Sequence, residues 1–233
     1  MKTSKPIKDS SFAVYGLGLT GNSVFEFLKK KNKKKIYTWD DKKNKNNKKK
    51  FNLFKKKLNE VDYIVISPGI NIKKTKFKSN LFRNRDKLIT DLDLFYMQKI
   101  PIKSIVITGT NGKSTTCKLI QHILKTNKLD AQLGGNIGKP ILDLKINQKS
   151  IVIIEASSFQ LSYAKFIKPN IAAILNISSD HLDWHNTIDN YKNSKFKIFS
   201  KQGSNNIALL SNINLIKLFK KKKYLSKLTI VKK

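Results

Sequence analysis

The sequence predicts an α/β protein built on parallel sheets, and two observations carry this prediction. Short apolar runs typical of buried strands alternate along the chain with segments of helical spacing. Two glycine-containing clusters, Gly16–Gly21 and Gly109–Gly112, each follow such a strand and precede a helix. In parallel α/β proteins, the turn between a strand and the N-terminus of a helix is where phosphate groups bind.

The first part of the chain is expected to form a Rossmann-like unit. Strands are predicted at residues 11–15, 35–39 and 61–67, with a helix at 20–31 between the first two. The lysine- and asparagine-rich stretch 42–57 fits either a loop or a solvated helix. This order of elements predicts a parallel sheet.

A second α/β unit is expected to begin between Thr90 and Pro101, so we place the domains at residues 1–95 and 96–233. The second unit is predicted to contain strands at residues 104–108, 151–154, 171–175 and 206–210, and helices at 113–125 and 191–200.

The formal net charge of +33 first suggests a nonenzymatic, basic nucleic-acid binder. The kind of basic residue argues against a specific nucleic-acid partner. Only Arg83 and Arg85 of the 48 basic residues are arginine, the residue that makes bidentate contacts with bases and phosphates. The surplus is lysine in company with asparagine and isoleucine, a mixture that AT-rich codons supply. We therefore expect only salt-sensitive, nonspecific affinity for polyanions.

Cysteine usage and hydropathy indicate a cytoplasmic protein. Cys117 is the single cysteine, so an intrachain disulfide is impossible and a reducing compartment fits. Residues 1–11 lack the apolar core of a signal peptide, and no apolar run approaches the roughly 18 residues of a membrane span. We expect a monomer without membrane insertion.

The first glycine cluster, Gly16-Leu-Gly-Leu-Thr-Gly21, fits the dinucleotide-binding pattern G-x-G-x-x-G. Asp40 and Asp41 follow about 20 residues later, where a carboxylate can accept hydrogen bonds from a ribose or a base. Taken alone, the motif favours an NAD-dependent oxidoreductase. Another diphosphate nucleotide, or a tight turn without any ligand, remains open.

The second cluster, Thr108-Gly-Thr-Asn-Gly-Lys-Ser-Thr115, predicts a phosphate-binding loop. Its backbone amides would surround phosphate, Lys113 would neutralise the β- and γ-phosphate oxygens, and the Ser114 hydroxyl would bind Mg²⁺. The loop is a shortened variant, because Ile107 stands where the strict Walker pattern requires glycine. An NAD dehydrogenase has no need of such a loop, so its presence shifts the first site away from NAD.

Three further groups are candidates for cation chemistry. Glu155 ends a predicted strand, and strand ends in α/β sheets are where ligands and hard cations lie, although a purely structural carboxylate is the alternative. His181 and His185 are four residues apart, but zinc is disfavoured because the H-E-x-x-H glutamate is absent and no third ligand is evident. Lys195 is the third candidate, but in a chain with so many lysines it is readily explained as a solvated surface charge.

In combination these segments resemble the Mur ligases, in family order and across nearly the whole chain. The resemblance is carried by Gly16–Gly21, Ser67–Ile70, Gly109–Thr115, Gly134–Gly138, Glu155–Leu161 and Asn176–Asp183. It implies a Rossmann-like UDP-substrate domain followed by an incomplete P-loop-type ATP-binding domain. The implied reaction joins D-glutamate to UDP-N-acetylmuramoyl-L-alanine through an acyl phosphate, with ATP as co-substrate.

The resemblance also implies a ligand for each candidate residue. The ATP phosphates would lie against Thr110, Asn111, Gly112, Lys113, Ser114, Thr115 and Thr116. The UDP-substrate would be held by Gly18, Leu19, Thr20, Asp40, Asp41, Ser67, Gly69, Asn136, Ser157 and Gln160. One Mg²⁺ would bind Ser114 and Glu155, and a second would bind His181 and a carbamylated Lys195. Lys113, His181 and Lys195 would be the catalytic residues.

The sequence departs from the family pattern in three respects. Trp184 stands where the family usually has arginine, and Asn212-Ile-Asn214 replaces an Asn-x-Asp-Asp run. The chain also ends before the central domain is expected to be complete, and the C-terminal amino-acid-binding domain of the family is absent from it. We therefore expect this chain not to complete the ligation by itself.

Overall fold

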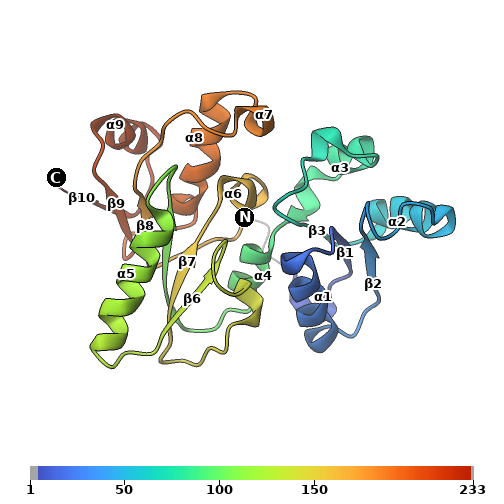
Figure 1. The fold of residues 1–233 in the computed structure, drawn as a ribbon, viewed down its shortest axis with the longest axis horizontal. Coiled ribbons are helices and arrows are strands. Elements are labelled where there is room, and N and C mark those ends of the chain that lie inside the picture. The colour runs from blue at the N-terminus through green and yellow to red at the C-terminus, as the bar shows by residue number, and fades with distance from the viewer. Residues whose placement is uncertain (1–4, 232–233) are drawn as a thin grey trace. The chain divides into compact units, whose positions relative to one another are not determined.

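The computed structural model describes residues 5–231, which form two compact α/β units (Figure 1). Unit 1 contains the chain up to Gln98 together with Tyr163–Lys165. Unit 2 contains Lys99–Ser162 and the chain from Phe166 onward. Each unit is built around its own parallel sheet.

Unit 1 has a four-stranded sheet in the order β2-β1-β3-β4, and every pairing in it is parallel. The strands are β1 (Phe12–Tyr15), β2 (Ile36–Trp39), β3 (Tyr63–Ile66) and β4 (Leu88–Ile89). The helices are α1 (Leu19–Lys31), α2 (Lys48–Glu60), α3 (Lys78–Arg83) and α4 (Asp91–Met97), with 3₁₀ turns at Ile7–Asp9, Ile72–Lys74 and Arg85–Lys87. Strands β1 and β3 are buried at every position, as expected for central strands covered on both faces.

The lysine-rich stretch 42–57 is helical only in its second part, where α2 begins at Lys48. The Asn47 side chain accepts an amide hydrogen bond from the first turn and so caps the helix. Phe54 and Leu58 lie one turn apart and are buried in the core of unit 1, with exposed fractions of 1% and 0%. Of the two alternatives, a solvated helix anchored by one apolar face therefore describes residues 48–57.

Unit 2 has a six-stranded sheet in the order β10-β9-β8-β5-β7-β6, again parallel throughout. The strands are β5 (Lys103–Thr108), β6 (Ala131–Gly135), β7 (Ile151–Glu155), β8 (Ile171–Ile174), β9 (Ile207–Leu210) and β10 (Lys227–Ile230). The helices are α5 (Lys113–Thr126), α6 (Ser158–Tyr163), α7 (Leu182–His185), α8 (Ile188–Phe196) and α9 (Ile213–Lys221), with 3₁₀ turns at Ile141–Asp143 and Lys197–Phe199.

The register of unit 2 brings three strand ends to one edge of the sheet. In the central strand β5, Ile107 pairs with Glu155 at the end of β7, and Thr108 pairs with Ile174 at the end of β8. The glycine loop after β5, the carboxylate of Glu155 and the segment after β8 therefore emerge side by side. This edge is where α/β sheets place their ligands.

The prediction of an α/β fold with parallel sheets is confirmed. The sequence does not predict β4, β6 or β10, since β4 is two residues long, β6 ends in two glycines, and β10 lies in a lysine-rich tail. Among residues 5–231, no helix combines the length and the apolar character needed to cross a membrane.

Gly21 is the position in unit 1 where a larger residue should be most disruptive. A Cβ atom on Gly21 would lie 1.8 Å from the carbonyl oxygen of Gly16, whereas a Cβ on Gly69 would meet no atom within 4 Å. We expect Gly21→Ala to lower the free energy of unfolding by about 1–3 kcal/mol or more, the usual cost of overpacking. Gly69→Ala is the control. Urea unfolding that finds both variants equally stable would contradict this close packing.

Candidate functional site

The phosphate loop joins β5 to α5 at the sheet edge. Gly112, the N-cap of α5, has a left-handed backbone with φ of 82°, which glycine adopts without strain. Lys113, Ser114 and Thr115 begin α5, where a helix leaves its first amides without intrahelical partners, and the Thr116 amide makes the first helical bond, to the Gly112 carbonyl. An anion at this point would meet donors and the positive end of the helix dipole.

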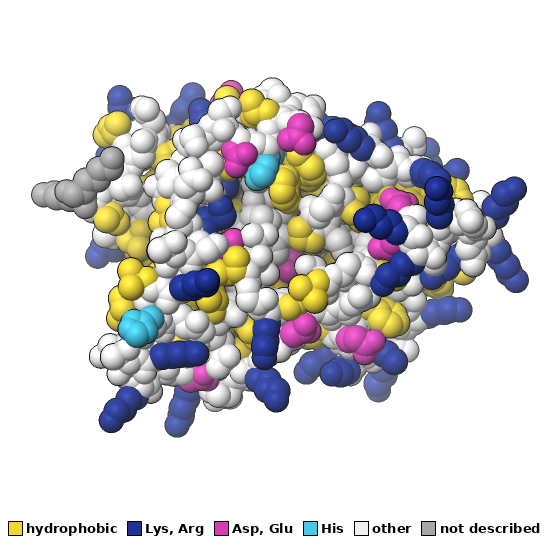
Figure 2. Space-filling model, in the orientation of Figure 1, with side chains coloured by type: hydrophobic (Ala, Val, Ile, Leu, Met, Phe, Trp, Pro, Cys, Tyr) yellow, Lys and Arg dark blue, Asp and Glu magenta, His cyan; other side chains and the backbone are white. Residues whose placement is uncertain are grey.

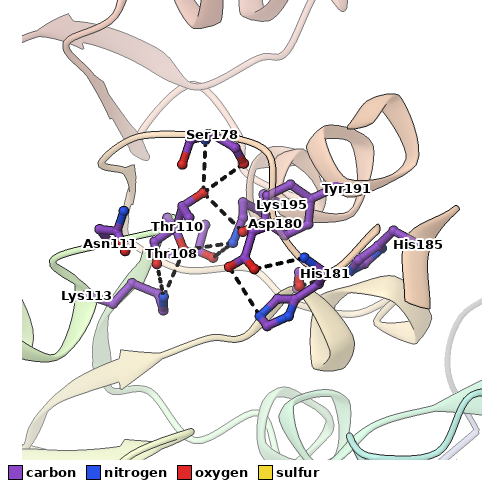
Figure 3. A network of polar contacts seen from close by, with 12 residues as sticks. Thr108, Thr110, Asn111, Lys113, Ser178, Asp180, His181, His185, Tyr191 and Lys195 are labelled. Carbon is purple, nitrogen blue, oxygen red and sulfur yellow. Dashed lines mark hydrogen bonds and ion pairs between the residues drawn. The ribbon is translucent and has the colours of Figure 1, made fainter. Parts of the chain in front are cut away.

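The segment after β8 holds the loop in place. The Thr110 amide donates to the Asn176 carbonyl at 3.0 Å, and the Asn111 amide donates to the Asn176 side chain at 2.9 Å. The Ser178 amide donates to Thr110 Oγ1 at 3.0 Å, and this hydroxyl also lies 3.1 Å from the Tyr191 hydroxyl (Figure 3). These contacts fix the loop before any ligand arrives.

Two lysines from different helices converge on the loop. Lys113 Nζ donates to the Gly109 carbonyl at 2.9 Å and to the Thr110 carbonyl at 2.7 Å. Lys195 Nζ, from α8, donates to the same Gly109 carbonyl at 2.8 Å (Figure 3). The two ammonium groups therefore share one acceptor, and their mutual repulsion must favour loss of a proton from one of them.

Lys195 is not a surface charge. Its side chain is 1% exposed, and Nζ lies 4.5 Å from the centre of the Tyr191 ring. Burial, followed by repulsion from Lys113, lowers the pKa of Lys195 to about 7, although Asp180 opposes the shift. The amine is therefore partly neutral near pH 7, which makes it a potential nucleophile.

Glu155 is a buried carboxylate held by two donors. Its exposed fraction is 1%, and its oxygens accept hydrogen bonds from Ser114 Oγ at 2.6 Å and from Asn136 Nδ2 at 2.7 Å. Within residues 5–231, no cluster of three His, Cys, Asp or Glu side chains could hold a metal ion. Mg²⁺ does not require one, since it binds through one or two protein oxygens together with phosphate and water. The Ser114–Glu155 pair therefore fits Mg²⁺ in the company of a phosphate.

The two histidines of the Asp180–His185 run have different environments. His181 has φ of 51°, and its Nε2 lies 3.4 Å from the Asp180 carboxylate. His185 is buried, and its Nε2 lies 3.0 Å from Ser158 Oγ. His185 thus connects α7 to α6, while His181 lies beside Asp180 near the loop (Figure 3).

Trp184, the departure from the family pattern, belongs to an aromatic cluster beside these histidines. Its ring centre lies 5.0 Å from that of Phe159 and 4.6 Å from that of His185. The Phe159 ring also lies 4.8 Å from His181. An indole can complete such a cluster, whereas it supplies none of the charge of an arginine.

In unit 1, the two predicted carboxylates are bonded to the first glycine loop and to the strand ends beside it. Asp40 accepts the Leu17 amide at 2.7 Å, and its pKa is lowered because amide hydrogen bonds outweigh the opposing effect of burial. Asp41 accepts the Tyr15 hydroxyl at 2.6 Å and the Trp39 indole N–H at 2.9 Å. Both carboxylates therefore have a structural role, whichever ligand the loop binds.

The remaining predicted residues of the UDP-substrate site fall in both units. Those in unit 1 lie in the loop after β1, at the start of α1 and in the turn after β3, and are Gly18, Leu19, Thr20, Ser67 and Gly69. Leu19 is 74% exposed, and Ser67 donates to the Gly16 carbonyl at 2.9 Å. In unit 2, Asn136 contacts Glu155, while Ser157 and Gln160 hydrogen-bond each other at the start of α6, where Gln160 is 1% exposed. The Gln160 side-chain oxygen is thus already engaged by Ser157.

Sequence reasoning missed Tyr191, Asn176 and Asp180 as parts of the site. Tyr191 precedes Lys195 by one helical turn, and that spacing was the available signal. Asn176 and Asp180 lie in the segment Asn176–Asp183 that carries the family resemblance, but their roles depend on how the segment after β8 folds against the loop.

A parallel α/β fold with a phosphate loop beside a buried glutamate defines a nucleotide-binding protein. Comparison with known families makes this more specific. Residues 107–232 match the Mur ligase middle domain, and residues 10–84 match the Mur ligase MurD-like, N-terminal domain. The chain belongs to the Mur ligase family.

Similar proteins include two described as UDP-N-acetylmuramoylalanine–D-glutamate ligase. The chain is 37% identical to that of Aquifex aeolicus, with 87% of this chain and 47% of the relative covered. It is 39% identical to that of Rickettsia bellii, with 88% and 46% covered. The chain thus spans about half the length of the curated relatives it matches. The structure of a UDP-N-acetylmuramate:L-alanyl-gamma-D-glutamyl-meso-diaminopimelate ligase from Neisseria meningitides shares the fold, with a TM-score of 0.56 and 14% identity over 94% of this chain and 77% of that one.

The buried amine of Lys195 should make stability depend on pH. The unfolded chain keeps this proton up to the ordinary pKa of 10.5, whereas the folded chain loses it near 7. The unfolded state therefore binds more protons between these values, so the free energy of unfolding should rise with pH across this window. Lys195→Met should lack this rise, which urea unfolding at several pH values would measure.

Lys192→Met, on the same helix but at a more exposed position, is the matched control and should keep the wild-type pH dependence. Identical pH profiles for wild type and Lys195→Met would show that the Lys195 pKa is not lowered.

Proposed function

We propose that this chain forms the UDP-substrate and ATP units of a ligase that joins D-glutamate to UDP-N-acetylmuramoyl-L-alanine, a cytoplasmic step in peptidoglycan precursor synthesis. One contact carries the proposal: Ser114 Oγ lies 2.6 Å from the buried Glu155 carboxylate where the phosphate-loop helix begins. The substrates are inferred from the shared name of the relatives.

The loop and its neighbours suit the γ-phosphate of ATP. The amides at the start of α5 and the Lys113 ammonium would neutralise phosphate charge, and Ser114 with Glu155 would hold Mg²⁺. When bound, Mg²⁺ would supply further charge neutralisation at the phosphate oxygens. Since Lys113 already lies against the loop carbonyls, it needs only a short movement to meet a phosphate.

The proposed chemistry has two steps. An oxygen of the substrate carboxylate attacks the γ-phosphorus, the bond to the bridging oxygen breaks, and ADP leaves. The amine of D-glutamate then attacks the acyl carbon of the acyl phosphate, phosphate leaves, and the nitrogen loses a proton. The chain's contribution to the first step is positioning and electrostatic stabilisation of the developing negative charge.

We also propose that His181 and Lys195 serve a second Mg²⁺. The partly neutral amine of Lys195 suits addition of CO₂, which would convert it into an anionic carbamate. Asp180, which influences the Lys195 pKa and lies 3.4 Å from the His181 ring, would then be a neighbour of both groups.

Substitutions in the loop test the ATP assignment. Lys113→Ala removes a cationic contact to phosphate, and Ser114→Ala removes a metal ligand. Since hydrogen bonds to charged groups contribute about 1.5–3 kcal/mol, each change should weaken Mg-ATP binding about tenfold or more in calorimetry. Lys118→Ala, exposed on the same helix, is the control. Wild-type affinity in both loop variants would refute the assignment.

Ligand preference distinguishes the proposal from an NAD-dependent oxidoreductase, which the first glycine motif favours when taken alone but which the matched family and the relatives named above do not support. Calorimetry should show UDP-N-acetylmuramoyl-L-alanine binding more tightly than NAD, because the glycine loop of unit 1 is expected to hold a uridine diphosphate. NAD binding as tight as that of the UDP compound would overturn the proposal for this unit.

A further inference from the structure

Helix α2 carries a basic face on the outside of unit 1. Nine of the sixteen residues from 42 to 57 are lysine, against about one residue in five in the whole chain, and no acidic residue occurs between Lys42 and Asn59. The lysine density of this stretch is therefore well above the average of the chain. Figure 2 shows the Lys and Arg side chains gathered over α2 and the turn before it.

An exposed leucine lies in the middle of this face. Leu53 is 44% exposed, while Phe54, the next residue, is buried in the core. The positions three and four residues away on the helix surface are all lysine. They are Lys49, Lys50, Lys56 and Lys57. We call Leu53 and these four lysines the α2 face.

Not all of the positive charge on the α2 face is equally available. Lys57 is paired with Glu60 at 2.5 Å and lies against the Tyr37 ring. Lys49 and Lys56 are exposed, and neither forms an ion pair within residues 5–231. They lie seven residues apart, two helical turns, and flank Leu53 on both sides.

We propose that the α2 face docks on an anionic lipid surface. Lysine ammonium groups are compact charges suited to lipid phosphates, and a polybasic helix face is attracted to anionic headgroups. An apolar side chain at the centre of such a face can enter the headgroup region. A nucleic acid would use the lysines but has no use for Leu53, so the leucine favours a lipid surface. The interaction is peripheral, because the apolar side of α2 is committed to the core of unit 1.

The test is co-sedimentation of the full chain with vesicles of equal parts phosphatidylcholine and phosphatidylglycerol, compared with phosphatidylcholine alone. Only the anionic vesicles should bind. Reversing both exposed lysines, in Lys49→Glu/Lys56→Glu, should weaken binding about tenfold or more. Lys118→Glu/Lys125→Glu on α5 changes the net charge equally, at two exposed positions also seven residues apart. This control should bind within about twofold of wild type.

Leu53 separates lipid docking from general affinity for polyanions. Leu53→Ser should weaken vesicle binding while leaving heparin binding unchanged. A polarity-sensitive fluorophore on Leu53→Cys should report an apolar environment with anionic vesicles only, and the buried Cys117 should not react with it. Equal loss of binding in the α2 and α5 variants, or no effect of Leu53→Ser on vesicle binding, would overturn the proposal and leave only nonspecific polyanion affinity.

Discussion

The buried carboxylate of Glu155 is the constraint on which the candidate ATP site depends. A carboxylate that is 1% exposed is costly unless donors satisfy it. Here Ser114 satisfies one oxygen and Asn136 the other. Through these two bonds the end of β7 fixes the start of α5 and the loop after β6. The same oxygens are those a hard cation would use, so the packing holds them where the proposed Mg²⁺ would bind.

Repulsion between two lysines is the second organising feature. Lys113 and Lys195 both donate to the Gly109 carbonyl, and the desolvated member, Lys195, has its pKa lowered to about 7. An arriving phosphate would offer Lys113 a stronger acceptor than a carbonyl oxygen, because charge-assisted hydrogen bonds to anions are the stronger kind. The electrostatics of Lys195 and of the phosphate loop are therefore coupled through one backbone oxygen.

The sequence predicted local features well because local rules determine them. The strand–glycine–helix order located both loops, and the position of Glu155 at a strand end placed it at the correct sheet edge. The burial of Lys195 could not be predicted from residues alone, since nothing local distinguishes it from the other lysines. Its setting arises from packing of α8 against the loop, visible only through Tyr191 and its contact with Thr110.

For the first glycine loop, the sequence predicted the local structure but not the partners of the two carboxylates. G-x-G-x-x-G with Asp40 and Asp41 predicted a turn between a strand and a helix that would bind a nucleotide, and the strand, turn and helix are present. The pattern could not reveal that Asp40 is bonded to the Leu17 amide, or that Asp41 is bonded to Tyr15. A carboxylate at the end of a strand can serve the ligand, the loop or both, and only the three-dimensional partners show what it does without a ligand.

Whether Glu155 holds the cation that accompanies ATP is tested most directly by the Mg²⁺ dependence of ATP binding. The measurement is ATP affinity of wild type and Glu155→Gln, each with Mg²⁺ and with the metal removed by a chelator. If Glu155 and Ser114 hold the cation that accompanies ATP, removing Mg²⁺ should weaken ATP binding to wild type strongly and to Glu155→Gln only slightly. The same Mg²⁺ dependence in both proteins would contradict the account.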